Sequence, residues 1–103
     1  MASLGKIPVF SGEDYAYRKF RMRAFLQSMG AEVCDITRNQ AYEVLAVRTT
    51  SLQVSEHEAN AKAVNALFVG VSHAEFSRVQ SFQEAHKVWT CLENYHEIGR
   101  AHV

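Results

Sequence analysis

Residues 55–70 read SEHEANAKAVNALFVG, and this stretch decides the fold class. Its apolar side chains recur every three or four residues, the spacing that places them on one side of an α-helix. It opens on Ser55, which Glu58 follows three residues later, and this is the capping-box pattern of a helix N-terminus. We therefore predict a helix that begins within two residues of Ser55 and buries one apolar stripe. The stripe consists of Ala59, Ala63, Ala66 and Leu67, widened by Val64 and Phe68.

Three further serines stand three residues before an acid, and each precedes a helical stripe. The pairs are Ser11/Asp14, Ser72/Glu75 and Ser81/Glu84. We predict helices that begin within two residues of each serine, with the first ending at Gly30 in a left-handed cap. Residues 39–48 indicate one more helix, whereas residues 33–37 are too few and too isolated to start a sheet.

These stripes predict an all-α protein, an irregular bundle of about five helices, because helical stripes must bury against one another where no sheet covers them. One proline and five glycines in the chain also favour helices over a turn-rich β fold. The predicted core consists of Tyr15, Met22, Phe25, Leu26, Leu45, Val64, Leu67, Phe68, Phe76, Val88, Trp89 and Leu92.

Composition excludes several classes of protein. The chain has 103 residues, of which 48% are hydrophobic and 21% charged, and its formal net charge is zero. That length suits one compact domain, and the balanced charge gives no general attraction to nucleic acid or membranes. No apolar run approaches the roughly 20 residues that span a bilayer. Cys34 and Cys91 stand far apart, so a reduced, cytoplasmic chain without a membrane partner is the simplest interpretation.

Four basic residues lie close together in the first predicted helix. They are Arg18, Lys19, Arg21 and Arg23. One interpretation is a nucleic-acid-binding surface that contacts phosphates. The other is an ordinary solvated helix face, which we favour because exposed aromatic residues do not alternate with the cluster and its members do not all share one face.

The sequence contains no pattern typical of chemistry. No two of the five histidines stand four residues apart on one predicted helix, and no pair of close cysteines could hold zinc. A nucleophile elbow, a glycine-rich phosphate loop and a paired-carboxylate motif are also absent from the sequence. We expect no enzyme activity, no metal or other cofactor, and no small-molecule substrate.

Two stretches together resemble the N-terminal region of the Gag polyprotein of copia-type LTR retrotransposons. Residues 10–26 resemble its opening, F-x-G-x-N-Y-x-x-W-x-x-x-M-x-x-x-L, and residues 85–95 resemble its later A-K-x-x-W-x-x-L-x-x-x-Y. Residues 60–68 resemble the helix between them, so the likeness extends from about Ile7 to Glu97. The residues that carry it are Phe10, Gly12, Tyr15, Met22, Leu26, Leu67, Phe68, Trp89, Leu92 and Tyr95.

The resemblance implies a structural role. Gag chains associate through helical domains into particles that package the element's RNA, which a zinc knuckle further downstream binds. We therefore expect residues 1–97 to form a Gag-like helical domain that makes homo-oligomers. The alternatives are a nucleic-acid-binding module that uses the basic first helix, and a domesticated host domain that grips a peptide. Arg18 replaces a family tryptophan, and a second aromatic is expected near Cys34, so we expect a degenerate copy.

The last residues carry a separate expectation. Residues 97–103 read EIGRAHV, which resembles the in-frame translation of a sequencing adapter. We expect residues 98–103 to be non-native and to pack against nothing, and the natural protein to continue where this chain is cut.

Overall fold

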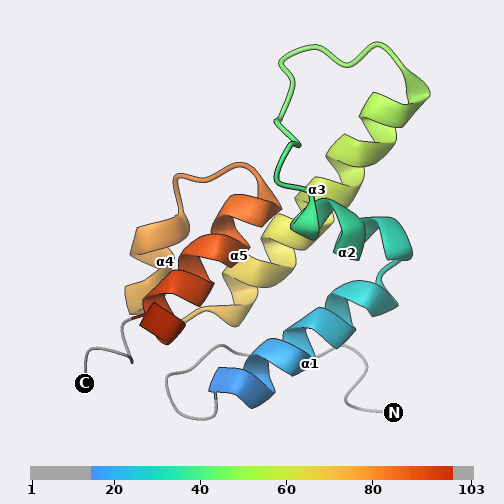
Figure 1. The fold of residues 1–103 in the computed structure, drawn as a ribbon. Helices are drawn as coiled ribbons and strands as arrows, with labels where there is room; N and C mark the ends of the chain where they lie inside the picture. The colour runs from blue at the N-terminus through green and yellow to red at the C-terminus, as the bar shows by residue number, and fades with distance from the viewer. Residues whose placement is uncertain (1–14, 99–103) are drawn as a thin grey trace.

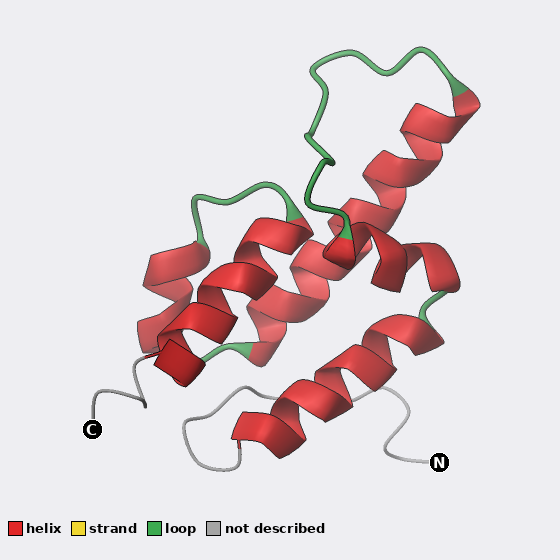
Figure 2. Ribbon diagram, in the orientation of Figure 1, coloured by secondary structure: helices red, strands yellow, loops and turns green. Residues whose placement is uncertain are grey.

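A computed structural model describes residues 15–98 of the chain, and these residues form an irregular helical bundle. Figure 2 shows helices and loops but no strand in this part of the chain, so the predicted all-α bundle is confirmed. The elements are α1 (Tyr15–Ser28), α2 (Ala31–Arg38), α3 (Ser51–Gly70), α4 (His73–Val79), α5 (Ala85–Glu93) and the short π-helix η2 (Asn94–Ile98) (Figure 1).

Helix α3 is the centre of the bundle, and α1, α2 and α5 pack against it. Its buried face carries the predicted stripe, with Ala59, Ala63 and Ala66 beside the fully buried Leu67. Alanines let neighbouring helices approach closely, while the leucine fills the space that remains between them. Helix α4 packs on the outer side of α5 (Figure 1).

The core agrees with the prediction at all but one position. Leu45 is the error, because it lies in a loop and 40% of its surface is exposed. Six of the predicted residues are buried: Tyr15, Met22, Leu26, Leu67, Val88 and Leu92. Five are partly buried: Phe25, Val64, Phe68, Phe76 and Trp89.

Tyr95, one of the residues that carry the family resemblance, is exposed, and the guanidinium of Arg78 lies 4.6 Å from the centre of its ring. Phe10 and Gly12 lie outside the described residues.

One predicted helix start is confirmed. Ser72 caps α4 by accepting a hydrogen bond from the Glu75 backbone N–H at 3.2 Å, and the Glu75 carboxylate accepts one from the Ser72 N–H at 3.0 Å. This is the reciprocal capping box that the sequence predicts. The expected start at Ser11 lies outside the described residues.

The start predicted at Ser55 is wrong, because α3 begins at Ser51 and Ser55 lies inside the helix. The capping box is formed instead by Thr50 and Gln53, whose backbone N–H donates to the Thr50 hydroxyl at 3.0 Å. Threonine with glutamine satisfies the same free N–H groups as serine with glutamate.

The start predicted at Ser81 is also wrong, because α5 begins at Ala85 and follows Glu84. The Glu84 carboxylate accepts a hydrogen bond from the Val44 N–H at 2.9 Å, so it does not turn back toward Ser81. The first N–H of α5, that of Ala85, donates to the Asn60 side chain of α3 at 2.8 Å. Groups from distant parts of the chain thus replace the expected local cap.

The helix predicted over residues 39–48 is wrong as well, and the helix that exists nearby is α2. Asn39 ends α2, and its side chain accepts a hydrogen bond from the Ala41 N–H, a local turn that competes with a helix. Gly30 joins α1 to α2 with a φ of 134° and a ψ of 145°, so it has the expected positive φ but is the N-cap of α2 rather than a left-handed cap of α1.

Candidate functional site

The four basic residues of α1 do not form one surface. Arg18 is partly buried, and its Nε has no hydrogen-bond partner among the described residues. The guanidinium of Arg21 lies over the ring of Tyr17, 5.7 Å from its centre, and donates to the Tyr17 hydroxyl. Lys19 contacts acidic residues and Arg23 lines a pocket, as described below, so the four basic side chains have different contacts.

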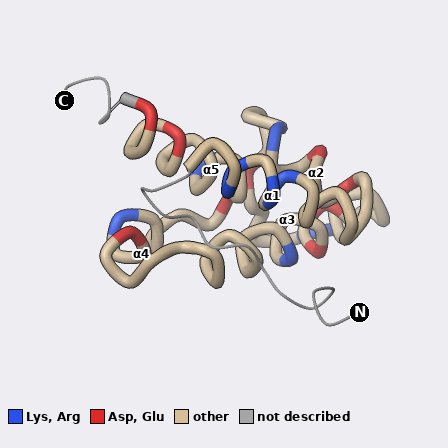
Figure 3. Tube along the Cα trace, turned by 90° about the horizontal axis from the view of Figure 1, so that it is seen from below, with Lys and Arg blue, Asp and Glu red and all other residues tan. Residues whose placement is uncertain are grey.

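Lys19 is neutralised by acids at the end of the bundle where α5 meets η2. Its Nζ lies 2.7 Å from a carboxylate oxygen of Glu93 and 2.7 Å from one of Glu97. Figure 3 shows acidic positions in red along the chain between α5 and the C-terminus. Burial lowers the pKa of Lys19, but the hydrogen bonds to the two carboxylates outweigh it and leave that pKa raised. Lys19 therefore joins α1 to α5 and is not an open phosphate contact.

A second polar contact joins α4 to η2. The Glu75 carboxylate of α4 contacts Nε2 of His96, and both side chains are buried. The His96 ring stacks on Tyr15 of α1 with 4.4 Å between the ring centres. These contacts tie α1, α4 and η2 together, and among residues 15–98 this is the only ion pair between an acid and a histidine. A structural role explains the pair.

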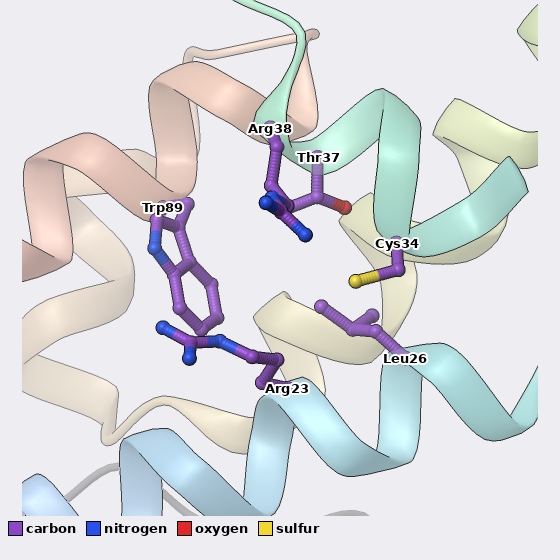
Figure 4. A pocket seen from close by; sticks show the side chains of 6 residues that line it. All are labelled: Arg23, Leu26, Cys34, Thr37, Arg38 and Trp89. Carbon is purple, nitrogen blue, oxygen red and sulfur yellow. The ribbon is translucent and has the colours of Figure 1, made fainter. Parts of the chain in front are cut away.

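Arg23 lines a pocket between α1, α2 and α5. Figure 4 shows its guanidinium and that of Arg38, the last residue of α2, extending toward the same space, with the indole of Trp89 as one wall. Leu26, Cys34 and Thr37 complete the lining, and the pocket measures about 180 Å³. Cys34 is buried, and Thr37 uses its hydroxyl to donate to the Val33 carbonyl.

This lining is unbalanced in charge. It contains two arginines and no acid. Within residues 15–98, no ion pair joins either guanidinium to a carboxylate. A wider depression of about 540 Å³ lies over α5, but its Lys87 is already paired with Glu84. The smaller pocket is therefore the better candidate for binding an anion.

A second candidate surface lies at the N-terminal end of α3, away from the pocket. We call residues 45–54 the arm; they comprise the loop before α3 and the start of that helix, and Figure 1 shows them projecting from the rest of the bundle. Half of the eight large hydrophobic side chains that are exposed among the described residues belong to the arm: Leu45, Val47, Leu52 and Val54.

The segment that leads into the arm is fixed from α5. The Glu84 carboxylate holds the Val44 N–H, and Nε2 of His86 lies 2.9 Å from the Tyr42 carbonyl oxygen. Because a carbonyl only accepts, Nε2 must carry the hydrogen. The hydrogen bond from Val44 has the largest effect on the pKa of Glu84 and lowers it. Burial opposes this effect by raising that pKa, and the charge of Lys87 adds to the lowering, so the pKa is lowered overall.

Sequence reasoning singled out Arg23 and Trp89 separately and did not name Arg38 or the arm. The spacing of Arg23 and Arg38 gives no signal, because α2 must fold back over α1 before the two meet. Within residues 15–98 no helix is long and apolar enough for a bilayer, and no three potential metal ligands come together. Comparisons with models of protein families, with curated proteins and with solved structures find no match.

Proposed function

We propose that this chain is a structural protein that associates with copies of itself through the arm and performs no catalysis. The observation that carries the proposal is the exposure of Leu52. This residue stands two helical turns before the buried Ala59, on the face of α3 that forms the core, yet 67% of its surface is exposed. The core-facing stripe thus continues beyond the part of the bundle that covers it.

A second copy of the chain suits this surface. Exposed apolar side chains gathered on one projection are typical of protein interfaces, whereas single exposed ones are ordinary. The arm and its flanks also carry both signs of charge, with Arg48 between Glu43 and Glu56. A two-fold arrangement places the same patch on both partners, so the arginine of each copy can lie against the acids of the other.

This role agrees with what the resemblance to copia-type Gag implies, namely a cytoplasmic retrotransposon protein that assembles into homo-oligomers. The proposed location and particle formation rest on that resemblance. Nucleic-acid binding through the whole basic helix is less favoured, because Lys19 is paired with two acids and Arg21 lies on Tyr17.

The test is light scattering or sedimentation over a range of protein concentrations. The mass of the wild-type chain should rise above the 11.6 kDa of the monomer as concentration increases. Leu52→Glu should hold the chain at the monomer mass, because an unpaired charge in an apolar interface is costly.

Val69→Glu is the matched control, since Val69 is a similarly exposed apolar residue at the other end of the same helix. It should associate as the wild type does. A wild-type chain that stays monomeric throughout, or equal effects of the two variants, would overturn the proposal.

A further inference from the structure

We propose that the arm of one copy of the chain binds the outer face of α1 of another copy, so that two unlike surfaces meet. The contact rests on the proposed function, because it names the surface to which the arm binds. We call Tyr17, Phe20, Arg21 and Arg23 the α1 face. In Figure 1, α1 lies along the lower side of the bundle and the arm projects from its upper side, so the two surfaces of one chain cannot meet.

The α1 face carries exposed aromatic rings. Tyr17 and Phe20 are 56% and 67% exposed, and both lie on the side of the helix that points away from the buried Met22. Exposed aromatic residues therefore do alternate with the basic residues of this helix, and the sequence-based expectation that they do not is wrong. Aromatic residues are enriched at protein interfaces. Within residues 15–98 the α1 face is thus a second place, after the arm, where large exposed apolar side chains lie close together.

The α1 face is also basic. Helix α1 contains no acid, and Arg21 and Arg23 are exposed. Within residues 15–98 no ion pair joins either guanidinium to a carboxylate. Arg21 donates one hydrogen bond to the Tyr17 hydroxyl, but a guanidinium has five N–H donors, so others remain for a partner. A partner that combines apolar side chains with carboxylates fits this face.

The base of the arm has that combination. Glu43 and Glu56 line a depression of about 420 Å³ between the segment before the arm and the start of α3, and its lining contains no lysine, arginine or histidine. Neither carboxylate forms an ion pair with another residue of the described part of the chain. Leu45 lines the same depression and is one of the exposed side chains of the arm. The acids and the apolar residues of the arm therefore form one continuous surface.

An arm and an α1 face complement each other better than two arms do. Each arm brings Arg48 together with the two acids Glu43 and Glu56, so in a pair of arms the acids outnumber the arginines. Arg48 also donates to the Leu45 carbonyl of its own chain. The α1 face instead offers two arginines to the two acids, and aromatic rings to the apolar side chains. Such charge complementarity selects the partner surface and its orientation.

Mixing two variants tests the contact. Leu52→Glu alters the arm and leaves the α1 face intact, whereas Phe20→Glu does the reverse. Each variant alone should stay at the monomer mass of 11.6 kDa in sedimentation. An equimolar mixture should form a one-to-one complex, because one intact arm can bind one intact α1 face. Both side chains are exposed, so circular dichroism should show unchanged helicity.

Charge reversal tests the electrostatic part of the contact. Arg21→Glu should weaken association by about tenfold or more, because it places like charges against each other. Adding Glu43→Arg or Glu56→Arg to the same chain should recover at least part of that loss. Lys62→Glu is the matched control, since it makes the same change in net charge at an exposed residue of α3 outside both surfaces. It should alter association by about twofold or less.

The outcomes separate this contact from self-association as such. If Phe20→Glu associates as the wild type does while Leu52→Glu stays monomeric, the arms pair with each other, and the α1 face is overturned while the proposed function stands. A mixture in which both variants stay monomeric would overturn it as well, as would equal losses from Lys62→Glu and Arg21→Glu. A wild-type chain that stays monomeric, or a Leu52→Glu chain that associates normally, would overturn the proposed function and this contact with it.

Discussion

Two adjoining parts of the segment between α2 and α3 are held in opposite ways. At Tyr42 and Val44 the backbone is bound by His86 and Glu84, residues 44 and 40 positions away in the chain. In the arm the hydrogen bonds are local, as when Arg48 donates to the Leu45 carbonyl. The first part is thus fixed by the core of the bundle, while the arm is fixed only by its own turn. The difference separates residues that stabilise the fold from residues available to a partner.

The largest effect should come from breaking the polar contacts that position Glu84 and His86. Asn60 is 3% exposed, donates to the Gln83 carbonyl at 2.7 Å and accepts from the Ala85 N–H at 2.8 Å. Asn60→Leu keeps the size of the side chain but leaves both backbone groups unpaired, so it should lower the free energy of unfolding by about 2–4 kcal/mol. Chemical denaturation measures it.

Asn65→Leu is the control on the same helix, because Asn65 is exposed and should tolerate the change. A loss for Asn60→Leu no greater than for Asn65→Leu would mean that these contacts do not hold the base of the arm.

Arg18 is an exception to the well-paired polar groups in the bundle. Its Nε is buried without a hydrogen-bond partner among the described residues, on the stripe of α1 that also carries Tyr15 and Met22. Arg18→Trp, which introduces the residue that copia-type Gag sequences have at the resembling position, should raise the free energy of unfolding by about 1–3 kcal/mol if most of the ring is buried.

The measurement is the denaturation midpoint at equal slope. An unchanged or lower midpoint would show that position 18 does not face the core. Cys34→Trp is expected to help less, although Cys34 proves to be buried beside the pocket.

Acid should weaken the base of the arm through Glu84. The pKa of Glu84 lies below its ordinary value of 4.5, chiefly because its carboxylate accepts the Val44 hydrogen bond. A carboxylate with a lowered pKa stabilises the fold fully above its unfolded pKa, and this contribution is lost as the pH falls through the folded pKa. Glu84→Gln, which keeps an acceptor but removes the charge, should cost about 1 kcal/mol at neutral pH.

The gap between wild type and Glu84→Gln should therefore close as the pH drops from about 4.5 downward, since protonation removes the same charge. Thermal melts across this range would show it. A gap that is constant with pH would mean that the charge contributes nothing. Glu97, whose pKa is also lowered, is present in both proteins and cancels in the comparison.

The sequence predicted the parts of the fold that depend on nearby residues. The alanine stripe of α3 and the capping box at Ser72 follow from spacings of three and four residues, and both are confirmed. The helix start predicted at Ser81 shows where such reasoning fails. The Glu84 carboxylate accepts its hydrogen bond from Val44 instead, and Asn60 of α3 caps the start of α5. No local pattern records a hydrogen-bond partner that lies 25 or 40 residues away.

The candidate sites were less accessible to sequence reasoning. For the four basic residues of α1 the sequence favoured a solvated helix face and left a phosphate-binding surface as the alternative, but it did not predict that folding gives Lys19 two acids and places only Arg23 in the pocket. Arg38 joins it because α2 packs against α1, and α2 itself was missed: its eight residues include several with β-branched side chains, which are weak helix formers. The expectation that residues 98–103 pack against nothing concerns side chains that lie outside the described part of the chain.

The smallest effect on folding should come from the arm. Val47 is 72% exposed, so Val47→Ser should change the free energy of unfolding of the monomer by no more than about 0.5 kcal/mol. The same change should weaken self-association, because it removes apolar area from the proposed interface. Denaturation at low concentration isolates the first quantity, and sedimentation at high concentration measures the second. A clear loss of monomer stability would show that Val47 packs against its own chain. Unaltered association would remove Val47 from the interface and leave Leu52 and its neighbours to form it, so the two measurements together decide whether the arm serves the fold or a partner.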